Sequence, residues 1–91
     1  MVNEFEEVLD MTKRGFSRNV IEVEEQGIIS VRKNINDSWS NVDPTMRIDT
    51  NLKRVVLYEE RYTILAMRIS EYFTERYGRY KLLRQIVEDP I

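Results

Sequence analysis

Apolar and polar residues follow a helical period at the start of the chain. The residues on one side of this predicted helix are Phe5, Val8, Leu9 and Thr12. Asn3 is a favourable N-cap residue, and Glu6 follows three positions later, as in a capping box. A glycine follows at position 15, where a helix commonly ends. We therefore predict a short amphipathic helix over residues 3–14.

Residues 20–31 are largely β-branched, which favours strands. A glycine near the middle of this stretch stands where a three-residue hairpin loop needs positive φ. With the turn placed there, Val23 pairs with Ile29 and Ile21 pairs with Val31 on one face of a β-hairpin. The same apolar positions also fit a helical period. An all-α small bundle is therefore the alternative fold.

Residues 34–49 are rich in turn-forming residues and contain the only tryptophan, Trp39. This composition predicts the one substantial loop of the chain. Asp43 followed by Pro44 suits the start of a helix, and Thr50 offers a second start. Either start leads into the next predicted element.

Apolar residues recur near a 3.6-residue period after this loop, with charged residues between them. We predict a long amphipathic helix over residues 50–77, which exceeds the average helix length of about 11 to 12 residues. The competing interpretation places strands at residues 55–58 and 62–66. Gly78 interrupts the pattern, and the apolar positions within residues 80–87 predict a short C-terminal helix.

The predicted fold class is α+β, with a short N-terminal helix, a β-hairpin, a long amphipathic helix and a short C-terminal helix. The chain has 91 residues, so we expect a single small domain over residues 1–91. So small a core covers only part of the long helix. We therefore expect some of its apolar and aromatic side chains to be covered by another molecule.

Composition removes most of the side-chain chemistry that enzymes use near neutral pH. The chain has no histidine and no cysteine, so imidazole catalysis, thiolate catalysis and a structural zinc site all lack their usual groups. Carboxylate pairs such as Glu59 and Glu60 are more typical of a solvated surface than of a hydrolase cleft in so short a chain. We expect no enzymatic activity, no cofactor and no metal.

Charge is divided unevenly along the chain, although the net charge is only −2. Residues 1–25 hold seven acids and three bases, and residues 53–87 hold eight bases and four acids. The charge of the first segment is therefore −4 and that of the second is +4. One interpretation is that the two ends pack against each other within one subunit. The other is a head-to-tail contact between copies.

Tyrosine and arginine are concentrated in the second half of the chain, and both are favoured at protein interfaces. The predicted interface residues are Trp39, Tyr58, Tyr62, Tyr72, Arg76, Tyr77, Arg79 and Tyr80. Alternating cations and rings are also typical of single-strand and RNA binding. The residues predicted for that alternative are Arg76, Arg79, Tyr80, Lys81 and Arg84.

These observations predict a non-catalytic protein–protein interaction module, either a small structural subunit or an inhibitor-like regulator that acts by occupying a surface. Its expected partner is another protein or a second copy, which would make a homo-oligomer. The alternative is a nucleic-acid-binding regulator that uses the C-terminal Arg/Tyr segment. The N-terminal residues are acidic where a leader would be basic, and no long apolar run is present. We therefore predict a cytoplasmic protein with no membrane partner.

Overall fold

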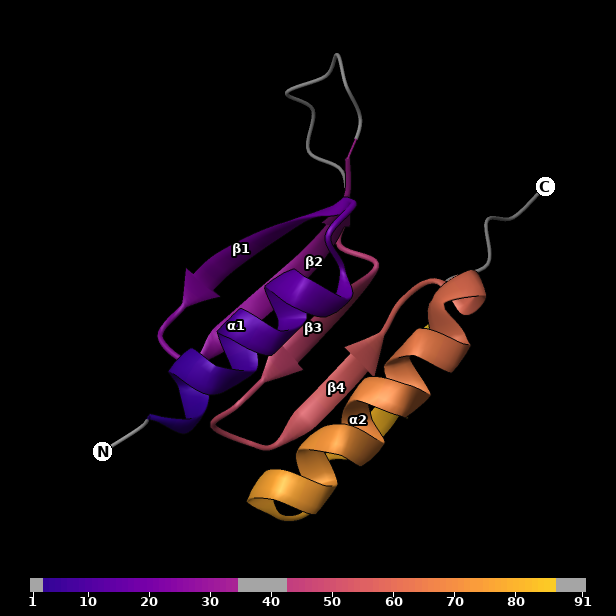
Figure 1. Ribbon diagram of the computed structural model, residues 1–91. Helices are drawn as coiled ribbons and strands as arrows, with labels where there is room; N and C mark the ends of the chain where they lie inside the picture. Colours follow the sequence, from indigo (N-terminus) through magenta and orange to yellow (C-terminus); the bar gives the residue numbers. More distant parts are fainter. Residues whose placement is uncertain (1–2, 35–42, 87–91) are drawn as a thin grey trace, which may run out of the picture.

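The computed structural model describes residues 3–34 and 43–86, which form a five-stranded sheet with two helices on one face (Figure 1). The elements in chain order are α1 (Glu4–Gly15), β1 (Asn19–Glu25), β2 (Ile28–Lys33), β3 (Met46–Asp49), β4 (Arg54–Leu57), the short 3-10 helix η1 (Glu60–Tyr62), α2 (Thr63–Tyr77) and β5 (Lys81–Arg84). The spatial order of the strands is β1-β2-β3-β4-β5. Neighbouring strands are antiparallel except β4 and β5, which are parallel and are connected through α2. The fold class is thus α+β.

The structure has the N-terminal helix and the hairpin where the sequence predicts them. The Asn3 side chain caps α1 by accepting a hydrogen bond from the backbone N–H of Phe5 (2.9 Å). In the hairpin, Val23 pairs with Ile29 and Ile21 pairs with Val31, in the predicted register. The all-α alternative is therefore wrong.

The predicted loop over residues 34–49 is wrong at its C-terminal end, because Met46–Asp49 forms β3. Met46 and Ile48 are buried and alternate with the polar residues Arg47 and Asp49, which is the pattern of a half-buried strand. No helix starts after Asp43 and Pro44. Residues 35–42, and with them Trp39, lie outside the described residues.

The long helix predicted over residues 50–77 is also wrong, because a turn, a strand and a 3-10 helix occupy its first half. An Asp49 carboxylate oxygen accepts hydrogen bonds from the backbone N–H groups of Asn51 (2.9 Å) and Leu52 (3.0 Å), which closes the β3–β4 turn. Lys53 completes this turn with a φ of 53°. The competing interpretation was correct for the strand near residues 55–58 and wrong for residues 62–66.

The predicted C-terminal helix is replaced by β5. Gly78 ends α2 with a φ of 93°, a conformation that favours glycine. The chain then turns back along β4, where Leu82 lies opposite Val55 and Leu83 lies opposite Val56. Parallel pairing with a distant strand therefore overrides the local helical spacing of residues 80–87.

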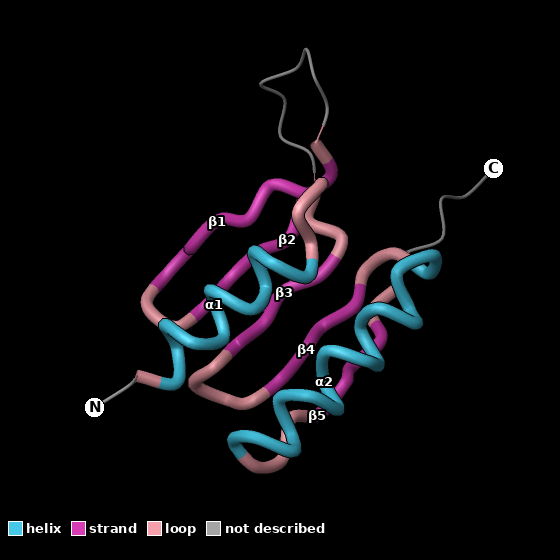
Figure 2. Tube along the Cα trace, in the orientation of Figure 1, coloured by secondary structure: helices cyan, strands magenta, loops and turns pink. Residues whose placement is uncertain are grey.

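The core lies between the helices and one face of the sheet. Its largest fully buried apolar side chains are Phe73 from α2, Val8 from α1, and Ile29, Val31, Met46, Ile48, Val55 and Leu57 from β2, β3 and β4. Figure 2 shows α1 over the β2 and β3 side of the sheet and α2 over β4 and β5. The opposite face of the sheet carries no helix in the described part of the chain. None of the helices described is long and apolar enough to cross a bilayer.

Candidate functional site: a groove between the two helices

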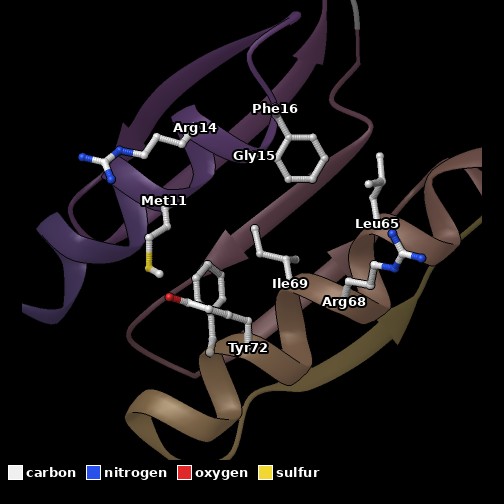
Figure 3. A pocket seen from close by; sticks show the side chains of 9 residues that line it. Met11, Arg14, Gly15, Phe16, Leu65, Arg68, Ile69 and Tyr72 are labelled. Carbon is white, nitrogen blue, oxygen red and sulfur yellow. The ribbon is translucent and has the colours of Figure 1, made fainter.

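An apolar groove of about 380 Å³ lies between α1 and α2. It is lined by Met11, Arg14, Gly15, Phe16, Leu65, Arg68, Ile69, Tyr72 and Phe73. Figure 3 shows Met11 and Phe16 on the α1 side, with Leu65, Ile69 and Tyr72 on α2 across from them. The groove therefore combines residues from the two ends of the sequence.

The helical period of α2 places the groove residues on one flank. Leu65, Ile69 and Tyr72 are four and three positions apart and so share one side of the helix. Phe16 and Phe73 are buried and belong to the hydrophobic core below. By contrast, Leu65 is 41% exposed and Tyr72 is 42% exposed, so the upper wall remains apolar and accessible. An exposed apolar concavity of this kind is typical of an interaction site.

The charged residues of the groove are cationic. Its lining includes Arg14 and Arg68 and no acidic residue. Arg14 forms an exposed ion pair with Asp10 at 3.2 Å, whereas Arg68 forms none with the described residues. Nearby, the Arg76 guanidinium lies 5.7 Å from the centre of the Tyr72 ring. The apolar groove is therefore bordered by positive charge.

Two of the predicted interface tyrosines instead hold the subunit together. The Tyr77 hydroxyl donates a hydrogen bond to Glu7 (2.5 Å), and the Tyr80 hydroxyl donates one to Glu4 (2.6 Å). Burial, together with these carboxylate partners, raises the pKa of both tyrosines. Lys53 reaches the same Glu4 carboxylate group at 3.4 Å. The acidic N-terminal helix and the basic second half therefore contact each other within one subunit.

Tyr58 and Tyr62 lie away from the groove. The Arg47 guanidinium donates a hydrogen bond to the Tyr58 hydroxyl (3.1 Å) and lies 5.4 Å from the centre of its ring. The Tyr62 hydroxyl accepts a 3.4 Å hydrogen bond from Asn19, the first residue of β1. Neither tyrosine lines the groove, so the structure does not bring the predicted interface residues together on one surface.

The residues predicted for nucleic-acid binding are also separated by the fold. Arg76 is on α2, where it packs over the rings of Tyr72 and Tyr77. Arg79 is exposed just before β5, and Lys81 and Arg84 are exposed on β5 itself. Tyr80 is buried and its hydroxyl is bound to Glu4, so its ring cannot stack on a base. The segment therefore offers cations without a free aromatic ring between them.

The helix-free face of the sheet carries a network of ion pairs. Glu24 on β1 binds Arg32 at 2.8 Å and Arg47 at 2.8 Å. The hydrogen bond from Arg47 is the main reason that the pKa of Glu24 is lowered. Beneath these side chains, the Ser30 hydroxyl is buried and makes no hydrogen bond within the described residues. This part of the face is therefore polar.

Of the predicted interface residues in the described part of the chain, only Tyr72 lines the groove. None of the other groove residues was predicted from the sequence: Met11, Arg14, Gly15, Phe16, Leu65, Arg68, Ile69 and Phe73. The spacing of Leu65, Ile69 and Tyr72 was the available signal, but apolar residues at that spacing are equally expected in a core. In the described residues, no group of three or more carboxylates is placed to hold a metal ion. Comparison with family models, curated proteins and solved structures found no match.

Proposed function

We propose that this chain is a non-catalytic protein-binding module whose inter-helix groove receives an apolar side chain from a partner segment with acidic flanks. The observation that carries this proposal is the accessible apolar groove between α1 and α2, bordered by Arg14 and Arg68. The protein would act by occupying the partner's surface, as a structural subunit or as an inhibitor-like regulator.

The lining of the groove favours a protein segment over a small molecule. Its volume of about 380 Å³ is at the lower end of the roughly 300–1,000 Å³ typical of ligand sites. Small-molecule sites also enclose most of the surface of their ligand, whereas here Leu65 and Tyr72 are 41% and 42% exposed, so the groove is open. An apolar wall with an arginine and tyrosine border is instead the composition of a protein-interface hot spot.

The positive border specifies the charge of the partner. Arg68 has no ion-pair partner among the described residues and is therefore available to a carboxylate of the incoming segment. A guanidinium binds a carboxylate through two parallel hydrogen bonds, which also fixes its orientation. The apolar anchor would supply most of the affinity, and the acidic flank would supply specificity and a faster association rate.

A peptide library displayed on phage and selected on the immobilised protein tests this proposal without a known partner. The selected peptides are expected to share an apolar anchor flanked by aspartate or glutamate. Their affinity should fall at least about 10-fold for Leu65→Ser and for Arg68→Glu, which corresponds to about 1.4 kcal/mol. Ile64→Ser is the matched control, because Ile64 is 63% exposed on the same helix but does not line the groove. Selected peptides that bind Leu65→Ser as tightly as the unmodified protein would refute the proposal.

Nucleic-acid binding by the C-terminal segment has less support. Single-strand binders place accessible aromatic rings beside their cations. In this chain the Tyr80 ring is buried and the Tyr77 hydroxyl is engaged by Glu7, which leaves Arg79, Lys81 and Arg84 without a stacking platform.

A further inference from the structure

The two edge strands of the sheet carry opposite charge. β1 and β5 are the outermost strands, and Figure 2 shows them on opposite sides of the sheet. β1 includes Glu22, Glu24 and Glu25, whereas β5 begins with Lys81 and ends with Arg84. Within the described residues, neither strand has a neighbour on its outer side. An edge of this kind presents unpaired backbone groups that another strand can bind.

Strand directions allow the two edges to pair directly between copies. β1, β2, β3 and β4 alternate in direction, and β5 runs parallel to β4. β1 and β5 of one copy therefore run in opposite directions. If a second copy lies beside the first with its helices on the same face, β5 of one meets β1 of the next as an antiparallel pair. Antiparallel strands form the more stable ladder.

One register matches both the charge and the apolar pattern of the two strands. With Lys81 opposite Glu22, Leu82 lies opposite Ile21 and Leu83 lies opposite Val20. Leu82 pairs with Val55 and Ile21 pairs with Val31 within one copy, so both side chains lie on the helix-covered face. The other four residues of this register lie on the helix-free face: Val20, Glu22, Lys81 and Leu83. A shift of the register by one residue would pair each residue of the helix-covered face with a residue of the helix-free face. Even shifts keep the faces matched, but they place Lys81 opposite Val20 or Leu83 opposite Glu22, so the combined match is specific to this register.

Both partners of the ion pair are accessible. Glu22 is 3.4 Å from Arg32, but its side chain is still 54% exposed. Lys81 is exposed and has no ion-pair partner among the described residues. β1 is the acidic edge strand and β5 is the basic one. Two β1 edges, or two β5 edges, would therefore repel each other. Charge thus favours a head-to-tail contact over a symmetric one.

A hollow beside β5 provides space for the side chains of the incoming strand. It has a volume of about 490 Å³ and is lined by Met67, Ser70, Glu71, Thr74, Glu75, Tyr80 and Leu82, so it lies between α2 and the outer strand. Met67 is 46% exposed there. On β1, Val23 belongs to the helix-covered face but is 50% exposed at the edge. In the register described, Val23 of the second copy would lie opposite Tyr80, at this hollow.

We infer that this chain assembles head to tail, with β5 of one copy adding to β1 of the next in a continuous sheet. An open assembly of any length therefore has a free β1 edge at one end and a free β5 edge at the other. Such a heterologous contact produces a ring if the rotation closes and a filament if it does not. The inter-helix groove is not part of this joint, so the assembly does not depend on the proposed function.

Sedimentation velocity of the full chain, from about 10 to about 500 μM, measures this assembly directly. The average mass of the unmodified protein is expected to rise beyond that of a dimer with increasing concentration. Raising the salt from about 0.05 to about 0.5 M should weaken the association, because the Glu22–Lys81 pair is solvent-accessible. A single-chain mass throughout this range would overturn the inference, as would a species that stops at a dimer.

Charge-reversal variants test whether the contact between copies is formed by β5 and β1. Glu22→Lys and Lys81→Glu should each reduce association at least about 10-fold, since each variant places two like charges opposite each other at this pair. An equimolar mixture of the two variants should associate again, because position 22 of each variant then meets an oppositely charged position 81 of the other. Glu6→Lys and Lys13→Glu are matched controls on the exposed side of α1 and should associate like the unmodified protein. A mixture that stays dissociated, while both variants keep the native circular dichroism spectrum, would refute the joint. Leu65→Ser should leave association unchanged, which separates this test from that of the groove.

Discussion

The Tyr80 hydroxyl donates a 2.6 Å hydrogen bond to Glu4, which ties the residue before β5 to the first turn of α1. The same carboxylate group lies 3.4 Å from the Lys53 ammonium at the end of the β3–β4 turn. The ring of Tyr80 also packs on Phe73, with 5.3 Å between ring centres. One buried phenol therefore connects the first helix, the second helix and the last strand.

Removal of this hydroxyl should reduce stability at neutral pH. Tyr80→Phe keeps the ring and loses the hydrogen bond to Glu4, so we expect the free energy of unfolding in urea to fall by about 1–2 kcal/mol at pH 7. Tyr72→Phe is the control, because the Tyr72 hydroxyl makes no hydrogen bond within the described residues, and its stability should change little.

The same hydroxyl makes stability sensitive to alkali. Burial raises the pKa of Tyr80 above its ordinary value of 10.0, so the phenol stays neutral in the folded chain when the unfolded chain ionises. This contribution to stability is complete below about pH 10 and is lost as the pH rises above it. Urea unfolding across this range should show a shallower loss for Tyr80→Phe than for the unmodified protein. Equal slopes would contradict the role given to Tyr80.

Loss of the Glu24 ion pairs should reduce the stability of the fold at acidic pH. The Arg47 hydrogen bond lowers the pKa of Glu24 below its ordinary value of 4.5, so its contribution is present above that pH and is lost as the pH falls through the lowered pKa. Glu24→Gln should cost about 0.5–1 kcal/mol at pH 7 and flatten the loss of stability below about pH 4.5. The matched control is Glu25→Gln on the same strand, because Glu25 forms no ion pair with the described residues. Thermal unfolding between pH 3 and pH 7 would measure both variants, and identical acid profiles would exclude the network as the cause.

Gly27 is required by the hairpin turn for two reasons. Its φ is 84°, and a Cβ atom at this position would lie 2.6 Å from the side-chain amide nitrogen of Asn51. That amide is held in place by a 2.9 Å hydrogen bond to the carbonyl of Gln26. We therefore expect Gly27→Ala to reduce the free energy of unfolding by about 1–3 kcal/mol.

Gly15→Ala provides a control of opposite sign in the same measurement. Gly15 is the last residue of α1, and nothing lies within 4 Å of a Cβ atom placed there. Alanine should therefore leave stability unchanged or raise it by up to about 1 kcal/mol through its better helix propensity. Equal destabilisation by the two substitutions would mean that the β1–β2 turn is not under the constraint described.

Local pattern was sufficient for α1 and for the β1–β2 hairpin. The cap at Asn3 and the turn at Gly27 act on residues close in sequence, so composition and spacing carry the information. Pattern failed for β3 and β5, which have four residues each. So short a segment cannot separate a period of 2 from one of 3.6. The pairing of Leu82 with Val55 is decided by contact with a strand far away in the sequence.

Residue types and their spacing were enough to establish the absence of histidine and cysteine chemistry, the first helix, the first hairpin and the division of charge between the two ends. Long-range packing, by contrast, buries Tyr80 against Glu4 and leaves Tyr72 exposed beside a groove. The groove exists because the sheet holds α1 and α2 apart above it, and neither helix encodes that separation. The opposite charges of β1 and β5 acquire a structural meaning for the same reason, since the strand order puts these two strands at the edges of the sheet.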